Sequence, residues 1–94
     1  MTLDSLLERD LTIVNRRGLH ARASAKLVKL VEKFEADVQV SKDGQTVGGT
    51  SIMGLMMLAA SPGCCIRVCV SGSDAEDALS AISELVESGF GEED

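Results

Sequence analysis

Apolar residues follow two different spacings along this chain, and the order in which the spacings alternate limits the folds that it can adopt. Alternation at every second residue is typical of strands, which we expect over residues 10–15, 38–41, 45–47 and 65–70. Spacings of three and four residues are typical of helices, which we expect over residues 21–34, 52–58 and 75–86. The predicted order β-α-β-β-α-β-α indicates an α+β fold with helices on one face of a mostly antiparallel sheet.

Short polar motifs mark where several of these elements begin and end. Asp-Gly at residues 43–44 is a strong signal for a two-residue hairpin between the second and third strands. Thr50 or Ser51 is expected to cap the short helix. Residues 73–76 have the pattern of a capping box at the head of the last helix, and Gly89 is expected to end that helix.

The length of the chain, 94 residues, suits a single domain over residues 1–94 with one modest core. Within this domain we interpret residues 1–9 as an N-terminal extension and residues 90–94 as a loose acidic tail. The chain has only two aromatic residues, Phe34 and Phe90, so we expect the core to be built from aliphatic side chains.

The charges are unevenly distributed along the chain. The net charge of −6 argues against nucleic acid as a partner, because binding to nucleic acid depends on clustered cations. Five cations nevertheless gather near the only histidine: Arg16, Arg17, Arg22, Lys26 and Lys29. A basic rim on an otherwise acidic protein indicates docking against an acidic partner.

Several other classes of protein are disfavoured by composition. No apolar run approaches the roughly 20 residues of a membrane span, and the first residues lack the pattern of a secretion signal, so we expect a cytoplasmic protein with no membrane contact. Cys64, Cys65 and Cys69 have neither the number nor the spacing of a disulfide framework or a zinc site. We therefore expect no metal and no cofactor.

His20 is the strongest candidate for a functional residue, because it lies where a strand pattern gives way to a helix pattern. Imidazole is a nucleophile that changes charge near neutral pH. The start of a helix offers unpaired N–H groups and a partial positive charge, which favour bound anions. A phosphoryl group on His20 would lie beside the amides of Ala21 and Arg22, with the Arg22 guanidinium as a further donor.

Residues 18–23, Gly-Leu-His-Ala-Arg-Ala, closely resemble the phosphorylation-site motif of HPr, the histidine phosphocarrier family of the bacterial phosphoenolpyruvate-dependent phosphotransferase system. The family usually has Gly-Leu-His-Ala-Arg-Pro, so Ala23 departs from it. The spacing of the later segments also matches, without gaps, from about Asp10 to Val86. The resemblance implies an open-faced two-layer sandwich, with a four-stranded sheet under three helices.

The resemblance also implies a function. His20 would accept a phosphoryl group on its pros nitrogen, Nδ1, from enzyme I, which is itself charged from phosphoenolpyruvate. It would then pass the group to an enzyme IIA-type protein. The chain would be a transiently phosphorylated carrier and not an enzyme, and we expect a monomer. We interpret Arg22 as a functional cation, and Arg16 and Arg17 as charges that serve solubility and docking.

A second site is implied at the short helix. Ser51 falls at the position that some bacteria phosphorylate with an ATP-dependent HPr kinase/phosphorylase, so regulation at Ser51 is expected beside its role as a cap. Too many apolar residues crowd this helix for all of them to be buried, and we expect at least Met53 to face outward. The partner-docking surface is expected to comprise Arg22, Ala25, Ile52, Met53 and Met56.

Two other functions stay open at this point. The chain could be a regulatory binding module of the nitrogen-related branch of the phosphotransferase system, whose partners respond to its phosphorylation state. It could also be a small hydrolase with His20 as general base. The hydrolase is disfavoured because the sequence provides no acid or nucleophile beside His20, and Ser24 is by pattern only a helix residue.

Overall fold

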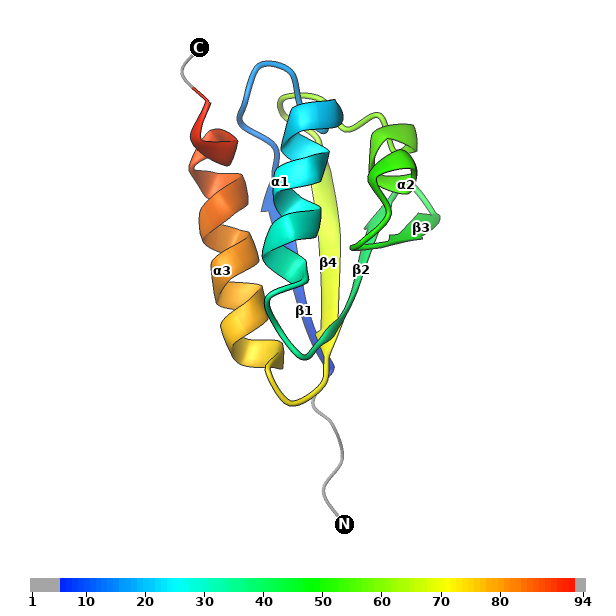
Figure 1. Cartoon of the computed structure of the whole chain (residues 1–94). Coiled ribbons are helices and arrows are strands. Elements are labelled where there is room, and N and C mark those ends of the chain that lie inside the picture. The colour runs from blue at the N-terminus through cyan, green and yellow to red at the C-terminus, as the bar shows by residue number, and fades with distance from the viewer. Residues whose placement is uncertain (1–5, 93–94) are drawn as a thin grey trace.

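A four-stranded antiparallel sheet lies behind the helices in the computed structural model, which describes residues 6–92 (Figure 1). Its order is β1-β4-β2-β3. The strands are β1 (Leu6–Thr12), β2 (Asp37–Lys42), β3 (Gln45–Gly48) and β4 (Cys65–Ser71). The helices are α1 (Ala21–Val31), α2 (Ile52–Met57), α3 (Ala75–Glu87) and a 3₁₀ turn, η1 (Gly89–Gly91). The predicted open-faced sandwich is confirmed.

The two faces of the sheet differ in polarity because successive side chains of a strand point to opposite faces. In β4, Ile66, Val68 and Val70 are buried, whereas Cys65 and Arg67 are exposed on the open face. Val40 lies opposite Val68 in the register between β2 and β4, so apolar residues of neighbouring strands stand side by side under the helices. The alternation seen in the sequence therefore decides which face the helices cover.

The helices cover the sheet with apolar stripes at the predicted spacing. In α1 the buried residues include Ala23, Leu27 and Val31, and α3 contributes Ala75, Ala78, Leu79, Ile82 and Val86. The core is almost entirely aliphatic, as expected, and Phe90 is the one aromatic ring in it among the described residues.

The turn between β2 and β3 has the predicted conformation. Asp43 (φ 50°) and Gly44 (φ 84°) both adopt left-handed backbone angles, and Lys42 is paired with Gln45. Two consecutive positive φ angles define the type I′ turn, whose twist matches that of the flanking strands.

The first strand begins earlier than predicted. It runs over Leu6–Thr12, where Leu6 pairs with Ser71 of β4, so residues 6–9 belong to the sheet and not to an N-terminal extension. Residues 1–5 lie outside the described residues. Within β1 only Leu11 is fully buried, so the strand shows little alternation. The point at which β1 begins depends on backbone hydrogen bonds with β4, and such bonds produce no pattern of side chains in the sequence.

The expectation of a loose acidic tail is wrong for residues 90–92. Phe90 is 1% exposed and packs in the core, and Lys26 Nζ donates a hydrogen bond to the Phe90 carbonyl oxygen at 2.7 Å. Glu92 is held by side-chain contacts as well. A single aromatic residue among glycines and acids gives no periodic pattern, which is why the sequence did not predict this packing. Residues 93–94 lie outside the described residues.

The predicted capping box at the head of α3 is also wrong. Asp74, not Ser73, is the N-cap residue, and its side chain makes no cap hydrogen bond. Asp74 Oδ2 instead accepts a hydrogen bond from the Glu35 backbone N–H at 2.7 Å, and Ser73 Oγ donates to the Glu35 carbonyl oxygen at 3.5 Å. Both side chains thus hold the loop between α1 and β2, which removes them from capping.

Replacing Phe90 with alanine should destabilise the fold strongly, because it removes a fully buried ring near the end of the described chain. We expect a loss of about 3 kcal/mol or more in the free energy of unfolding, measured by urea denaturation. Phe34→Ala, at a half-buried ring, is the matched control and should cost less. A Phe90→Ala loss no larger than that of Phe34→Ala would contradict the observed packing of η1.

Candidate functional site

The loop between β1 and α1 is held at one point where its backbone approaches that of residue 60. Leu19 N donates to the Ala60 carbonyl oxygen at 3.0 Å. Gly18 has a positive φ of 61°, and a Cβ there would lie 1.9 Å from the same oxygen. Glycine is therefore required at residue 18, both for its backbone angles and for the close approach.

His20 is the N-cap residue of α1, which confirms the predicted helix start. Its backbone is extended, and its side chain makes no cap hydrogen bond. The first-turn amides, including those of Ala21 and Arg22, have no partner within the helix by geometry. Ser24 Oγ is buried and donates to the Leu19 carbonyl oxygen at 3.2 Å, so this hydroxyl is engaged in holding the helix start.

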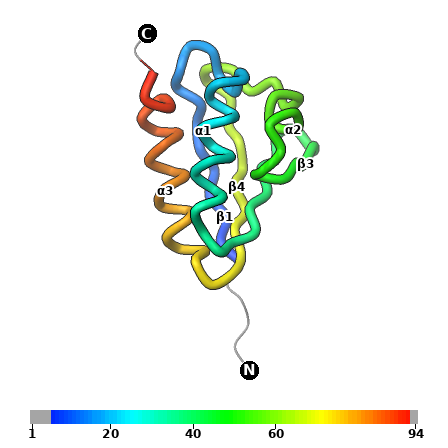
Figure 2. The backbone as a smooth tube through the Cα atoms, in the orientation of Figure 1, coloured from blue at the N-terminus to red at the C-terminus, as the bar shows by residue number. Residues whose placement is uncertain are grey.

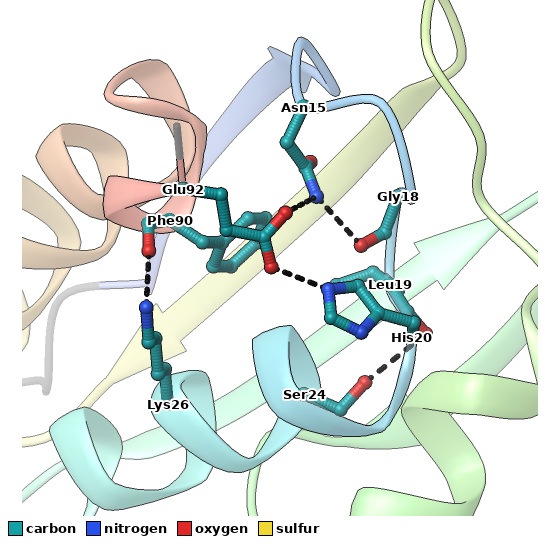
Figure 3. A network of polar contacts seen from close by, with 8 residues as sticks. All are labelled: Asn15, Gly18, Leu19, His20, Ser24, Lys26, Phe90 and Glu92. Carbon is teal, nitrogen blue, oxygen red and sulfur yellow. Dashed lines mark hydrogen bonds and ion pairs between the residues drawn. The ribbon is translucent and has the colours of Figure 1, made fainter. Parts of the chain in front are cut away.

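Glu92 lies directly against His20, although 72 residues separate them in the sequence. Figure 3 shows the Glu92 carboxylate between the His20 ring and Asn15, with Oε2 on His20 Nε2 and Oε1 accepting from Asn15 Nδ2 at 3.0 Å. Asn15 Nδ2 also donates to the Gly18 carbonyl oxygen at 2.9 Å. The side chains of His20 and Glu92 are 23% and 10% exposed. Nothing in the sequence distinguishes Glu92 from the neighbouring acids, so sequence analysis missed it.

The environment of Glu92 favours the ionised form of its carboxylate. The hydrogen bond from Asn15, and then that with His20, holds the pKa of Glu92 below its usual value. An ionised carboxylate has no proton to donate, so His20 Nε2 is the donor of the shared hydrogen bond. In the neutral ring the lone pair then lies on Nδ1, which in Figure 3 faces the first turn of α1.

Arg22 and Arg17, two of the cations that lie near His20 in the sequence, have exposed side chains. Arg22 makes no salt bridge or side-chain hydrogen bond within residues 6–92, so its guanidinium is available to a ligand. Ala25 is half-buried one turn further along α1.

The second predicted site lies on α2, which contacts α1 (Figure 2). Ser51 is exposed and caps α2, because its Oγ accepts a hydrogen bond from Gly54 N at 3.0 Å, as predicted. Met53 is 69% exposed, which confirms that it faces outward. The other exposed apolar side chains of this helix are Ile52, Met56 and Met57. Cap and apolar surface are therefore adjacent.

Cys64, Cys65 and Cys69 are free thiols. Among residues 6–92 no group of acids, cysteines and histidine is arranged to hold a metal ion. None of the helices in this part of the chain has the length and apolar character that crossing a bilayer would require.

The contact at Glu92 predicts a pH dependence of stability. A carboxyl whose pKa is lower in the folded state stabilises the fold above its unfolded pKa, and this stabilisation is lost as the pH falls through the folded pKa. The stability advantage of the wild type over Glu92→Gln should therefore be present at about pH 5 and shrink towards about pH 3, as urea denaturation would measure. An advantage that does not change over this range would contradict the contact.

Comparison with known proteins gives consistent matches over most of the chain. The family described as the PTS HPr component phosphorylation site matches residues 7–88. A phosphocarrier protein HPr from Xylella fastidiosa is 49% identical over 88 residues, covering 94% of this chain and 99% of that protein. A phosphocarrier protein NPr from Shewanella violacea is 41% identical over 86 residues, covering 92% of this chain and 94% of that protein.

Solved structures agree with the sequence matches. A crystal structure of HPr from Thermoanaerobacter tengcongensis superposes with a TM-score of 0.88 at 41% identity, covering 93% of this chain and 98% of that chain. A crystal structure of an HPr dimer from the same organism has a TM-score of 0.73 at 41% identity, covering 87% and 94%. Because sequence and structure match over nearly the whole length, this chain belongs to the HPr family of phosphocarrier proteins of the phosphotransferase system.

Proposed function

We propose that this protein carries a phosphoryl group on Nδ1 of His20. The observation that carries the proposal is the placement of this nitrogen at the uncapped start of α1, while Nε2 is engaged by Glu92. The unpaired amides of the first turn and the helix dipole stabilise the negative charge of the phosphoryl oxygens. Transfer of a phosphoryl group needs mainly positioning and electrostatic stabilisation, and this arrangement provides both.

Enzyme I is the proposed donor, charged from phosphoenolpyruvate, and an enzyme IIA-type protein is the proposed acceptor. The docking surface comprises the cations around His20 and the exposed apolar side chains of α2, together with Ala25. Flexible methionines such as Met53 and Met56 suit a surface that must accept more than one partner. We propose that the carrier acts as a monomer in the cytoplasm, since the same surface must be open to each partner in turn.

Arg22 has the proposed role of closing on the phosphoryl group. It lies in the first turn of α1, where a cation is unfavourable because the helix dipole is already positive there. A bound phosphoryl group removes this conflict and supplies an acceptor for the guanidinium. Apart from the bond to Nδ1, the group is held by contacts that a partner can replace, so it can be released when an acceptor atom bonds to phosphorus and the P–Nδ1 bond breaks, leaving its electron pair on the ring.

Ser51 is proposed as a regulatory phosphorylation site for an HPr kinase/phosphorylase. Its exposed side chain lies at the helix start, where a phosphate is tolerated. The roughly two added negative charges would stand beside Ile52 and Met53 on the docking surface and repel an acidic partner.

A second candidate is a regulatory module of the nitrogen-related branch, whose partners respond to the phosphorylation state of His20. This candidate is favoured by the 41% identity between this chain and a protein named phosphocarrier protein NPr. The two functions share the chemistry at His20 and differ in the acceptors downstream. Incubation of the phosphorylated protein with sugar-type and nitrogen-type enzyme IIA proteins would separate them.

Replacing His20 with alanine should abolish phosphoryl acceptance without unfolding the protein, because the side chain is partly exposed and contributes little to the core. We would incubate each protein with enzyme I and labelled phosphoenolpyruvate and test the product for acid lability, which is typical of phosphohistidine. Circular dichroism and urea denaturation would confirm that the variant is folded. Full labelling of His20→Ala would refute the site, and no labelling of the wild type by active enzyme I would refute the function.

Ser51→Asp should slow acceptance from enzyme I, because it places a negative charge on the docking surface while aspartate still caps α2. The effect is expected in the KM for this protein, by roughly tenfold. Ser51→Asn keeps the cap without the charge and should behave like the wild type. Equal kinetics for the aspartate and asparagine variants would mean that Ser51 only caps the helix.

A further inference from the structure

The geometry points to Glu92 as a positioning residue for phosphoryl transfer: its carboxylate holds the His20 ring with the proton on Nε2, so that Nδ1 is the nucleophile. This inference rests on the proposed function and extends it to a residue outside the motif at 18–23. Glu92 touches neither the phosphoryl group nor the donor, and it acts through the ring.

The hydrogen bonds around Glu92 leave one arrangement of donors and acceptors. Asn15 Nδ2 lies 2.9 Å from the Gly18 carbonyl oxygen and 3.0 Å from Glu92 Oε1, so the amide gives its two protons to two acceptors. Turning the amide over would bring its oxygen against both acceptors. Asn15 is 4% exposed, which fixes it in place. Glu92 Oε1 is therefore always an acceptor for Asn15, and Oε2 is left for His20.

The segment that carries Glu92 is anchored and not loose. Gly89 (φ 69°) and Phe90 (φ 58°) both have left-handed backbone angles, which turn the chain back towards α1 after α3 ends. The Phe90 ring is buried, and Lys26 of α1 holds its carbonyl oxygen. Because the same segment is fixed to the core and to α1, the carboxylate is delivered to His20 at a defined position (Figure 3).

The transfer step shows what the carboxylate contributes. The Nδ1 lone pair of His20 forms a bond to phosphorus, while the bond between phosphorus and the donor atom of enzyme I breaks and the donor keeps that electron pair. The His20 ring gains positive charge as the new bond forms, and the ring proton stays on Nε2. An ionised carboxylate on Nε2–H stabilises this charge, as the aspartate does for the histidine of a serine protease triad.

Replacing Glu92 with glutamine keeps the size of the side chain but changes its hydrogen-bonding groups. The variant therefore separates an effect on the His20 ring from an effect on packing. Because Asn15 needs an acceptor, the glutamine oxygen must take the place of Oε1, and its NH₂ group then faces His20 Nε2. The ring can accept that proton only by moving its own proton to Nδ1, which removes the nucleophilic lone pair. Glu92→Ala removes the carboxylate without forcing this tautomer. The isosteric glutamine should therefore impair transfer more than alanine.

The kinetic experiment measures phosphoryl acceptance from phospho-enzyme I at several concentrations of each variant. We expect Glu92→Gln to lower the maximum rate by at least about tenfold, Glu92→Ala to lower it less, and the KM to stay unchanged. Glu87→Gln, at the exposed last residue of α3, makes the same charge change and should match the wild type. Maximum rates for both Glu92 variants that equal or exceed the wild-type rate would overturn the inference.

A spectroscopic experiment reports on the ring itself. His20 is the only histidine, so the imidazole ¹⁵N resonances of labelled protein belong to a single ring. We expect the proton on Nε2 in the neutral ring of the wild type and on Nδ1 in Glu92→Gln. The same tautomer in both would overturn the inference. Should the wild type accept no phosphoryl group from active enzyme I, the proposed function fails, and the tautomers still decide whether Glu92 positions the ring.

Discussion

The close contact between the loop backbone at Gly18 and the Ala60 carbonyl oxygen fixes the rest of the site. It holds the chain at Leu19, two residues before α1 begins, and so helps to determine where the first-turn amides point. A side chain at residue 18 would push the loop away and carry the Asn15 anchor and the His20 ring with it. No side chain caps this helix start, so the position of His20 depends on this backbone contact together with the hydrogen bonds of Ser24 and Glu92.

The site combines two structural demands that compete in most helices. A stable helix start is normally capped by a side chain, whereas a phosphate site needs those amides unpaired. Here Ser24 holds the helix start from inside, through the Leu19 carbonyl oxygen, and leaves the outer amides open. The contrast with Ser51 is direct, because that residue caps α2 in the ordinary way. The uncapped start of α1 and the capped start of α2 thus belong to two helices that contact each other.

Much of the fold follows from the sequence, because periodic patterns report burial. The alternation in β4, the apolar stripe of α3 and the Asp-Gly turn at 43–44 were all predicted and observed. The errors occur where backbone pairing, one isolated side chain or a contact with a distant loop decides the structure, as in the first residues of β1, at Phe90 and at the head of α3. The motif predicted the place of His20 at the helix start. Its partner Glu92 could not be predicted, because a contact across 72 residues leaves no local pattern.

The separation of His20 from Glu92 also matters for the order in which the site forms during translation. His20 and the loop around it leave the ribosome 72 residues before the carboxylate that contacts the ring. A nascent or truncated chain that stops before residue 92 therefore carries the complete motif at 18–23 but lacks one of the contacts that hold the imidazole. On the role proposed for Glu92, full competence for transfer would be acquired only when η1 has docked beside α1, which would make activity a late event in the maturation of the protein.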